Sequence, residues 1–476
     1  MPERILITGL FRILYLSMTT VLVAAFLWPA GSARADVRVG HDTVRVGIAQ
    51  QVSEVKLHFQ GRYRLTDTST GRVIAETRDG QQWHMANVGG FIVLSRDGEQ
   101  HRLFSGAVRA EEINVKRSIL SGNGPPLWKD SLSGMAVLSA GSGMSHIDDT
   151  DDMRVVTGQG ALSRLFQGGL NLFGLEQHGG ICRYRGHVEV RAGSFGFTVI
   201  NELPVEQYLY GVVPAEMPAS FPSEALKAQA VASRTYVLAS LGSYAGQGFD
   251  VLDTQQNQVY RGFDVEHPQA SRAVNDTAGQ VLVHRGQPIA AFFHSSSGGY
   301  TENCEDVWVE SLGYIRGKED QADLNPKHYN WVVNLSAEQL TRTVNEQMKK
   351  LTDLANTVDF AVISDLRELQ HTATGQRVKK MFIEGYDTLG NPRQLEISNA
   401  DRVRVILGLN SALFTMHKDV DAGGRLGGVV FTGSGLGHGL GMSQWGASGM
   451  SLKGYNYQDI LQYYYTGADL VNNYGA

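Results

Sequence analysis

Two consecutive segments decide the fold of this chain: LPVEQYLYGVVPAEMP at residues 203–218 and SEALKAQAVASRTYVLASL at residues 223–241. The second segment follows a proline and carries alanine, leucine and valine on every side, which predicts a largely buried helix. Its charged residues Glu224, Lys227 and Arg234 share one narrow stripe, because steps of three and seven residues return nearly to the same face. We expect this stripe to be the helix's only solvent-facing side.

The first segment carries one glutamate, Glu216, between Pro214 and Pro218. Proline fixes φ and disfavours helix, so the pattern predicts that Glu216 lies on a stiff turn just before the buried helix. Its apolar neighbours disfavour the charged carboxylate and would raise its pKa toward that of a general acid. The alternative is an ordinary surface glutamate on a loop that enters a helix.

Period-two alternation marks the region on the N-terminal side of this block. Residues 44–48 and 55–59 alternate apolar with polar side chains and are followed by turn formers, which predicts strands. We interpret residues 36–175 as a β-rich accessory region that ends in a Gly/Ser-rich linker from about residue 120, and residues 176–476 as a second domain of mixed α+β structure. The predicted fold class is α+β. Further strands are expected at residues 187–190, 197–200, 358–363 and 381–384, and further helices at 336–352 and 457–464.

The composition excludes several classes of protein. A chain of 476 residues with 42% hydrophobic side chains is long and apolar enough for a globular core. Its formal net charge of −6 offers no basic surface for nucleic acid. The only two cysteines, Cys182 and Cys304, exclude a four-cysteine zinc site. In an oxidising compartment they could form one disulfide, or both could remain thiols.

The first 35 residues have the pattern of a secretory signal peptide. Arg4 and Arg12 precede an apolar stretch at residues 21–28, and the small-residue site Ala33-Arg34-Ala35 follows. We expect an exported protein that begins near Asp36 and is periplasmic or associated with the cell wall. A retained membrane anchor is the alternative, although the apolar stretch is shorter than the ~20 residues of a spanning helix.

Two glycine-rich clusters lie in the second half of the chain, HSSSGGYTE at residues 294–302 and GLGHGLGMSQWGA at residues 435–447. In the first, hydroxyl groups and two glycines suit close approach to a polyhydroxylated ligand; a Ser/His hydrolase is less favoured, since Gly-x-Ser-x-Gly is absent. In the second, glycine at every second position strips one face of a strand, which suits a chain-like ligand or close backbone packing. There, His438 and Trp445 would either contact a sugar or simply pack in the core. Metal binding by His294, Cys304 and His438 is a further alternative, but their spacing matches no standard zinc pattern.

Together these blocks resemble the SpoIID/LytB family, the stage II sporulation protein D and amidase-enhancer group of peptidoglycan proteins. The resemblance covers roughly residues 180 to 470. It is carried by residues 184–186, 201–209, 214–218, 224–236 and 294–302, by Arg404 with residues 407–411, and by residues 437–447.

The resemblance implies a lytic transglycosylase that cleaves the bond between N-acetylmuramic acid and N-acetylglucosamine, with Glu216 as the catalytic residue and a 1,6-anhydro product. Sporulation members act on strands whose stem peptides an amidase has removed, so glycan strands and an N-acetylmuramoyl-L-alanine amidase are the expected partners. No cofactor or metal is expected. The runner-up is a non-catalytic module that stimulates an amidase.

We expect substrate contacts from polar and aromatic residues of these blocks, in one groove with Glu216. The sequence offers no obvious partner for the second carboxylate that a hydrolase would need, although Asp253 stays a candidate. The expected contacts are Tyr260, His294, Ser296, Thr301, Arg404, His438, Ser443, Gln444 and Trp445.

Overall fold

The computed structural model describes residues 43–88, 91–97, 99–104, 106–113, 170–177, 179–308, 310–323, 327–351 and 358–472, together with six short strands between residues 117 and 166. The predicted signal peptide and much of the predicted linker lie outside these residues. The described chain divides into two compact units. The first unit comprises residues 43–292 and 450–472, and the second comprises Phe293–Gly449.

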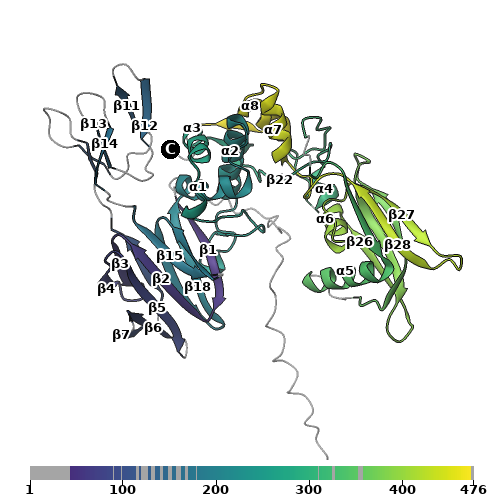
Figure 1. Ribbon diagram of the computed structural model, residues 1–476, viewed down its shortest axis with the longest axis horizontal. Helices are drawn as coiled ribbons and strands as arrows, with labels where there is room; N and C mark the ends of the chain where they lie inside the picture. The colour runs from purple at the N-terminus through teal and green to yellow at the C-terminus, as the bar shows by residue number, and fades with distance from the viewer. Residues whose placement is uncertain are drawn as a thin grey trace, which may run out of the picture. The chain divides into compact units, whose positions relative to one another are not determined.

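Two sheets, antiparallel except for one strand pair, form the β-rich part of the first unit (Figure 1). Within the described residues of these two sheets, only β1 and β19 pair in parallel. The seven-stranded sheet has the order β19-β1-β18-β17-β8-β3-β4, with β1 (Thr43–Val52), β3 (Tyr63–Asp67), β4 (Arg72–Glu76), β8 (Val108–Glu112), β17 (His187–Gly193), β18 (Gly196–Pro204) and β19 (Val251–Leu252). The six-stranded sheet has the order β16-β15-β2-β5-β6-β7, with β2 (Glu54–Gln60), β5 (Gln81–Val88), β6 (Phe91–Arg96), β7 (Glu99–Phe104), β15 (Leu172–Gln177) and β16 (Gly180–Tyr184).

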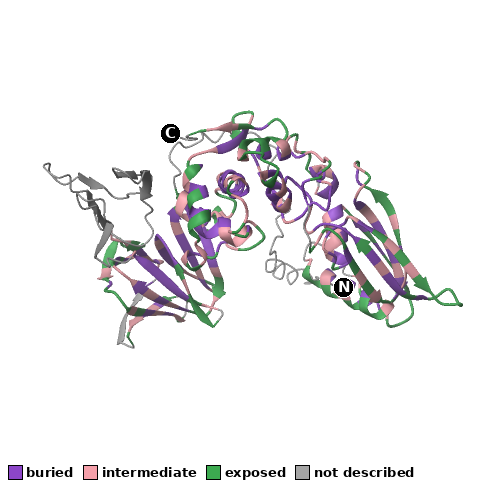
Figure 2. Ribbon diagram, turned by 45° about the horizontal axis from the view of Figure 1, so that its top comes forward, coloured by how far each residue is buried: buried purple, intermediate pink, exposed green. Residues whose placement is uncertain are grey.

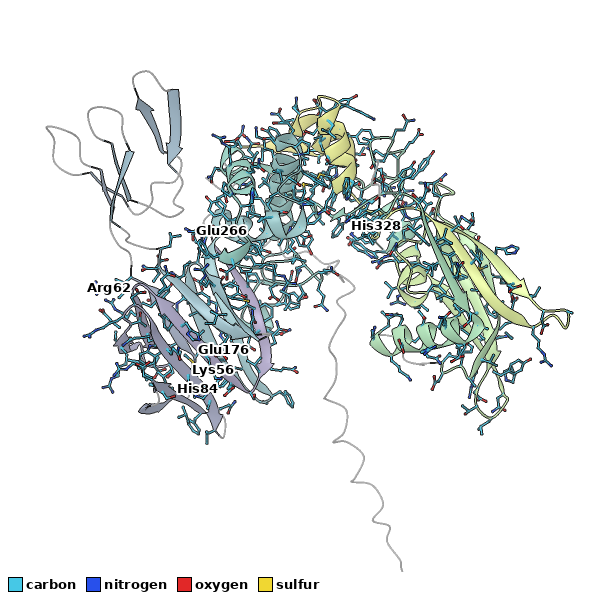
Figure 3. All side chains as sticks on the ribbon, viewed as in Figure 1. Lys56, Arg62, His84, Glu176, Glu266 and His328 are labelled. Carbon is cyan, nitrogen blue, oxygen red and sulfur yellow. The ribbon has the colours of Figure 1, made fainter. Side chains whose placement is uncertain are left out.

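The alternation that predicted these strands separates a core face from a solvent face. Along β2, Val55, Leu57 and Phe59 are buried, and the ring of Phe59 lies 4.9 Å from that of Tyr63 on the other sheet. The opposite face is charged: the ammonium group of Lys56 on β2 lies 3.8 Å from the carboxylate of Glu176 on β15 (Figure 3). A period of two therefore places apolar groups inside and ion pairs outside, as the sequence indicated.

The domain boundary predicted near residue 175 falls inside these sheets. Strands β1 to β8 end before that residue, β15 spans it and β16 to β19 follow it, yet β1 pairs with β18 and β2 pairs with β15. The segment interpreted as a linker also contains three hairpins. They are formed by β9 (Arg117–Ile119) with β10 (Leu127–Lys129), β11 (Met135–Ser139) with β12 (Gly143–Ile147), and β13 (Met153–Val156) with β14 (Leu162–Phe166).

The described part of the first unit also contains the α-helices α1 (Val205–Glu216), α2 (Ser223–Ala239), α3 (Pro268–Asp276) and α8 (Tyr457–Tyr464). The predicted buried helix is confirmed as α2, and burial concentrates on α1, α2 and alternate strand positions (Figure 2). The solvent-facing stripe was wrong for Arg234, which is 2% exposed. Its guanidinium is held by Glu206 of α1, so this position of the stripe faces a neighbouring helix, whereas Glu224 and Lys227 are partly exposed.

The second unit contains two three-stranded sheets and a separate apolar core. One sheet has the order β23-β28-β27 and the other β24-β25-β26, and α5 and α6 contribute Leu340, Val344 and Val403 to the core. The bounds are β23 (Trp331–Ser336), β24 (Val362–His371), β25 (Val378–Tyr386), β26 (Pro392–Ser398), β27 (Phe414–Val420), β28 (Leu426–Gly433), α5 (Ala337–Lys350) and α6 (Ala400–Ile406). The predicted helix at 336–352 is confirmed: Ser336 caps α5, its hydroxyl accepting the Gln339 N–H at 3.1 Å.

The described residues bear on two expectations, a membrane-spanning helix and a disulfide bond. Within them, none of the helices is both long enough and apolar enough to cross a membrane. Cys182 on β16 and Cys304 at the start of α4 (Cys304–Val307) are free thiols in different units. Burial raises the pKa of the Cys304 thiol to about 12, so this thiol is unreactive at neutral pH.

Candidate active site

Glu216 is the last residue of α1, not part of a turn as its flanking prolines predicted. Pro214 lies within the last helical turn, where it removes one backbone hydrogen bond without breaking the helix. Pro218 acts as expected on the residue before it: Met217 is extended, with φ −130° and ψ 133°, and ends the helix. The two prolines therefore place the carboxyl at a sharply defined helix end.

The carboxyl group of Glu216 is held by a segment distant in sequence. Its Oε1 accepts the backbone N–H of Val259 at 2.6 Å. Burial raises the pKa of Glu216 to about 7, although the Val259 hydrogen bond acts in the opposite direction by favouring the carboxylate. A carboxylic acid with this pKa holds a transferable proton at neutral pH, which is the requirement for a general acid.

Two tyrosine hydroxyls from α1 and α2 lie in the electrostatic surroundings of Glu216. Burial raises the pKa of both Tyr208 and Tyr236, and interaction with Glu216 raises each further. Both hydroxyls are therefore neutral at physiological pH. Neither hydroxyl therefore places a second negative charge beside Glu216.

The loop from Asp253 to Tyr260 carries the Val259 N–H that binds Glu216 at the end of α1. Val259 of this loop also lines a hollow of about 510 Å³ on the first unit. Apart from Leu252 and Val259, the lining is polar, with three glutamines, one threonine and one arginine. The lining residues are Gln50, Leu252, Thr254, Gln255, Gln256, Val259 and Arg261. Amide and hydroxyl groups of this kind match the hydrogen-bonding groups of a sugar chain.

Tyr260 and Asp253 take different places around this loop. Tyr260 is 2% exposed; its hydroxyl donates to Asn201 Oδ1 at 2.8 Å, and its ring lies 5.0 Å from that of Tyr208. It therefore packs in the core beneath the loop instead of presenting its ring to a ligand. Asp253 is half-buried and interacts electrostatically with Tyr208, so a second carboxylate belongs to the same neighbourhood as Glu216.

The serines of the predicted sugar-binding clusters bind a buried aspartate of the second unit. Asp323 accepts hydrogen bonds from the hydroxyls of Ser296, at 2.9 Å, and Ser443, at 3.0 Å, and from Ser297. Ser296 and Ser443 are fully buried. Through Asp323, these hydroxyls connect the loop after β22 (Phe293–His294) to β29 (Met442–Ser443), which pairs with β22 in parallel.

The two histidines are neutral and bound to the main chain. The ring of His294, 5% exposed, contacts the Leu440 carbonyl through Nδ1 at 3.0 Å, so Nδ1 carries the proton. Nδ1 of His438 accepts the N–H of Leu440 at 3.0 Å. Burial and the charges of Arg404 and Arg377 lower the pKa of His438 to about 3, and burial lowers that of His294. Neither ring is a base poised near neutral pH.

The other predicted contacts differ in their exposure. Thr301 is buried, and its hydroxyl accepts the N–H of Lys318 at 3.1 Å. Arg404 on α6 is partly exposed, and its Nε donates to Asp401 Oδ1 at 2.6 Å. Gln444 is buried, whereas Trp445 is half-buried on α7 (Gln444–Leu452).

The glycines of residues 435–441 lie in a loop and not in the strand that their spacing suggested. Gly435, Gly437, Gly439 and Gly441 all have φ between 67° and 111°, where side chains are strained. A Cβ on Gly439 would lie 2.7 Å from the guanidinium carbon of Arg377. Close packing on a buried arginine, the second of the two expected uses, accounts for this glycine.

Sequence reasoning missed Asp323 and the buried pair Arg377–Glu302. Arg377 is 1% exposed; it donates to the carbonyls of Tyr300, at 2.8 Å, and Ser297, at 2.7 Å, and lies 3.4 Å from Glu302 Oε1. Neither Asp323 nor Arg377 stands in a motif. The one local signal was the cluster of hydroxyl residues and glycines that surrounds them, which offers donors and space to a buried charge.

The single groove and the metal site are two further predictions from the sequence. The expected single groove joins Glu216 and Tyr260 of the first unit to residues of the second unit, and it stays a prediction. Among the described residues, no group of three or more His, Cys, Asp or Glu side chains could hold a metal ion. His294 and His438, two of the three proposed ligands, have ring centres 5.4 Å apart.

Comparison with known proteins identifies the family. The profile described as Stage II sporulation protein matches residues 194–284, and a domain of unknown function (DUF8618) matches residues 310–441. The Stage II sporulation protein D of Bacillus subtilis is 31% identical over 286 residues, covering 57% of this chain and 75% of the relative. The Amidase enhancer of the same organism is 33% identical over 301 residues, covering 56% of this chain and 40% of the relative. The matched block contains α1, α2 and Glu216, and the chain belongs to the SpoIID/LytB family that its motifs resembled.

Proposed function

We propose that this protein is an exported lytic transglycosylase that cleaves peptidoglycan glycan strands, with Glu216 as its general acid and base. The observation that carries the proposal is the carboxyl at the end of α1. Its pKa is about 7, one of its oxygens is held by the Val259 N–H, and a polar hollow adjoins the same loop. The match to relatives named for sporulation and amidase enhancement supports peptidoglycan as the substrate.

The proposed reaction uses one carboxyl group in two steps. Protonated Glu216 gives its proton to the glycosidic oxygen, and the bond from that oxygen to C1 of N-acetylmuramic acid breaks. The carboxylate then takes the proton of the 6-hydroxyl of the same sugar, whose oxygen bonds to C1 and closes the 1,6-anhydro ring. Glu216 ends protonated and no water is consumed. A second carboxylate nucleophile is not required, in contrast to a retaining hydrolase.

The polar hollow and several second-unit residues are the proposed glycan contacts. Gln255, Gln256 and Arg261 offer amide and guanidinium groups beside the loop that holds Glu216. Partial exposure makes Arg404 and Trp445 the stronger candidates among the predicted contacts of the second unit, whereas burial gives Ser296, Thr301 and Ser443 a structural role first.

The alternative function is stimulation of an amidase without glycan cleavage, which the match to the Amidase enhancer favours. A module of that kind needs a surface for glycan or for the amidase, but it does not need a carboxyl with a raised pKa. The state of Glu216 is therefore the feature on which the two proposals differ.

Mass analysis of the fragments that the purified protein releases from isolated glycan strands tests the proposal. Anhydro-ended fragments are expected; reducing-ended fragments would indicate a hydrolase, with Asp253 as the candidate second carboxylate, and no fragments a binding module. Glu216→Gln should fold and bind glycan while turnover falls by roughly 10²-fold or more. Glu224→Gln is the matched control, because Glu224 on the next helix accepts hydrogen bonds from Lys227 and the Tyr457 N–H. Wild-type turnover by Glu216→Gln would overturn the mechanism.

A further inference from the structure

The acid at the end of α1 depends on a loop that has little regular structure of its own. Between β19 and Tyr260, the backbone closes through hydrogen bonds from Asn257 N to Thr254 O, at 3.0 Å, and from Tyr260 N to Asp253 O, at 3.1 Å. At the end of this loop, the N–H of Val259 points at Glu216 Oε1. The direction of that N–H therefore depends on the hydrogen bonds that attach the loop to the neighbouring elements.

Asn257 fixes the loop on two sides at once. Its Oδ1 accepts the N–H of Leu252 at 2.9 Å, and its Nδ2 donates to the hydroxyl of Tyr236 on α2 at 3.4 Å. Asn257 thus ties the end of β19 and helix α2 to the loop, two residues before Val259. An asparagine amide is suited to this position because it supplies both an acceptor and donors.

Gln258 adds a second connection on the inner side. Its Oε1 accepts the hydroxyl of Tyr208 from α1 at 3.3 Å, and its Nε2 donates to the Ser233 carbonyl of α2 at 3.3 Å. Gln258 is fully buried, whereas Asn257 is half-buried. Replacing Gln258 would leave a void and unpaired groups in the core, so Asn257 is the position that can be changed with the smaller structural cost.

The groups that surround Glu216 carry few competing charges. Tyr208 faces it from α1 and Tyr236 from α2, and both are neutral because burial raises the pKa of each hydroxyl. The loop contributes Asp253, which interacts with Tyr208, and Arg261, which is exposed. The Val259 N–H is a dipole that acts directly on the carboxyl group.

We propose that Asn257 is a positioning residue that aims the Val259 N–H at Oε1 of Glu216. The hydrogen bond stabilises the carboxylate, so it keeps the acid strong enough to give up its proton despite its burial. The role in turnover rests on the proposed function, whereas the effect on the acidity of Glu216 does not.

The test is a titration of the Glu216 carboxyl by carbon NMR in the full mature chain without substrate, with Glu216→Gln identifying its signal. In Asn257→Ala the pKa of Glu216 should rise by roughly one pH unit, because the Val259 N–H is no longer held in place. Tyr236→Phe keeps the bond to the Leu252 N–H but removes the acceptor on α2, so a smaller rise is expected. Asn345→Ala is the matched control in the second unit. The Asn345 amide also accepts one hydrogen bond, from the Phe360 N–H, and donates one, to the Phe360 carbonyl. The Glu216 titration should be unchanged in this variant.

The outcomes separate this inference from the proposed function. An unchanged Glu216 pKa in folded Asn257→Ala, or in folded Tyr236→Phe should Asn257→Ala not fold, would overturn the positioning role even if turnover fell. A raised pKa in a protein that releases no anhydro-ended fragments would support the positioning role and reject the transglycosylase. If the positioning role and the transglycosylase activity are both supported, the alkaline limb of the pH profile of turnover should move to higher pH in Asn257→Ala, together with the pKa of Glu216.

Discussion

Arg234 of α2 and Glu206 of α1 form a bidentate ion pair at the N-terminal end of the helix that carries Glu216. Nε of Arg234 lies 2.7 Å from Glu206 Oε1, and Nη2 lies 2.6 Å from Oε2. Arg234 also donates to the carbonyls of Gln280 and Val274. A planar guanidinium satisfied on both edges locks α1 against α2 and α3.

Replacing Glu206 with glutamine is expected to cost stability, because it leaves a buried guanidinium without its counter-charge. We expect a loss of about 3 kcal/mol in the free energy of unfolding, measured by urea denaturation. Glu76→Gln is the matched control: Glu76 pairs with the exposed Arg62 and Arg64, so its loss should be below about 1 kcal/mol. Equal effects from the two variants would show that the buried pair has no special role.

The raised pKa of Glu216 predicts that wild-type stability falls as pH rises. The native state binds this proton more tightly, with a pKa of about 7 against 4.5 for an unperturbed glutamate. Between those values the unfolded state therefore carries fewer protons, and the free energy of unfolding decreases with pH. The full contribution is at most about 3 kcal/mol, since partial solvent access reduces it.

Comparison of wild type with Glu216→Gln at pH 5 and pH 8 isolates this contribution. Glutamine does not ionise, so the free energy of unfolding should fall less in Glu216→Gln than in wild type between pH 5 and pH 8. Parallel curves for the two proteins would contradict the raised pKa.

Removal of Asp323 should destabilise the second unit. Asp323→Ala leaves the hydroxyls of Ser296, Ser297 and Ser443 without their shared acceptor in a buried site. We expect a loss of at least about 3 kcal/mol, visible in hydrogen exchange of β22 and β29. Asp421→Ala offers a control within the same unit, because Asp421 binds two backbone N–H groups on an exposed turn and should cost below about 1 kcal/mol.

Chelation of metal ions should leave glycan cleavage unchanged, because proton transfer by a carboxylic acid requires no Lewis acid. The measurement is the release of anhydro-ended fragments before and after treatment with EDTA. Activity that disappears with EDTA and returns with zinc would instead assign a metal to His294, Cys304 and His438.

Local sequence determined the secondary structure and the location of the acid. Alternation of apolar residues along β1 and β2, and the alanine-rich composition of α2, indicated these elements because periodicity reports which faces can be buried. The flanking prolines distinguish Glu216 in the sequence, although they predict a turn where the structure has a helix. The packing of Val205, Tyr208 and Leu209 of α1 into the core outweighs that local preference.

Only the tertiary structure decided what surrounds each charge. The Val259 N–H reaches Glu216 from 43 residues away, Glu206 neutralises Arg234 from 28 residues away, and Asp323 gathers serines from both glycine-rich clusters. Periodicity shows that a residue faces inward, but not which distant group it meets there. Because burial and hydrogen bonding set a pKa more strongly than neighbouring residues in sequence do, the acidity of Glu216 follows from the packed fold.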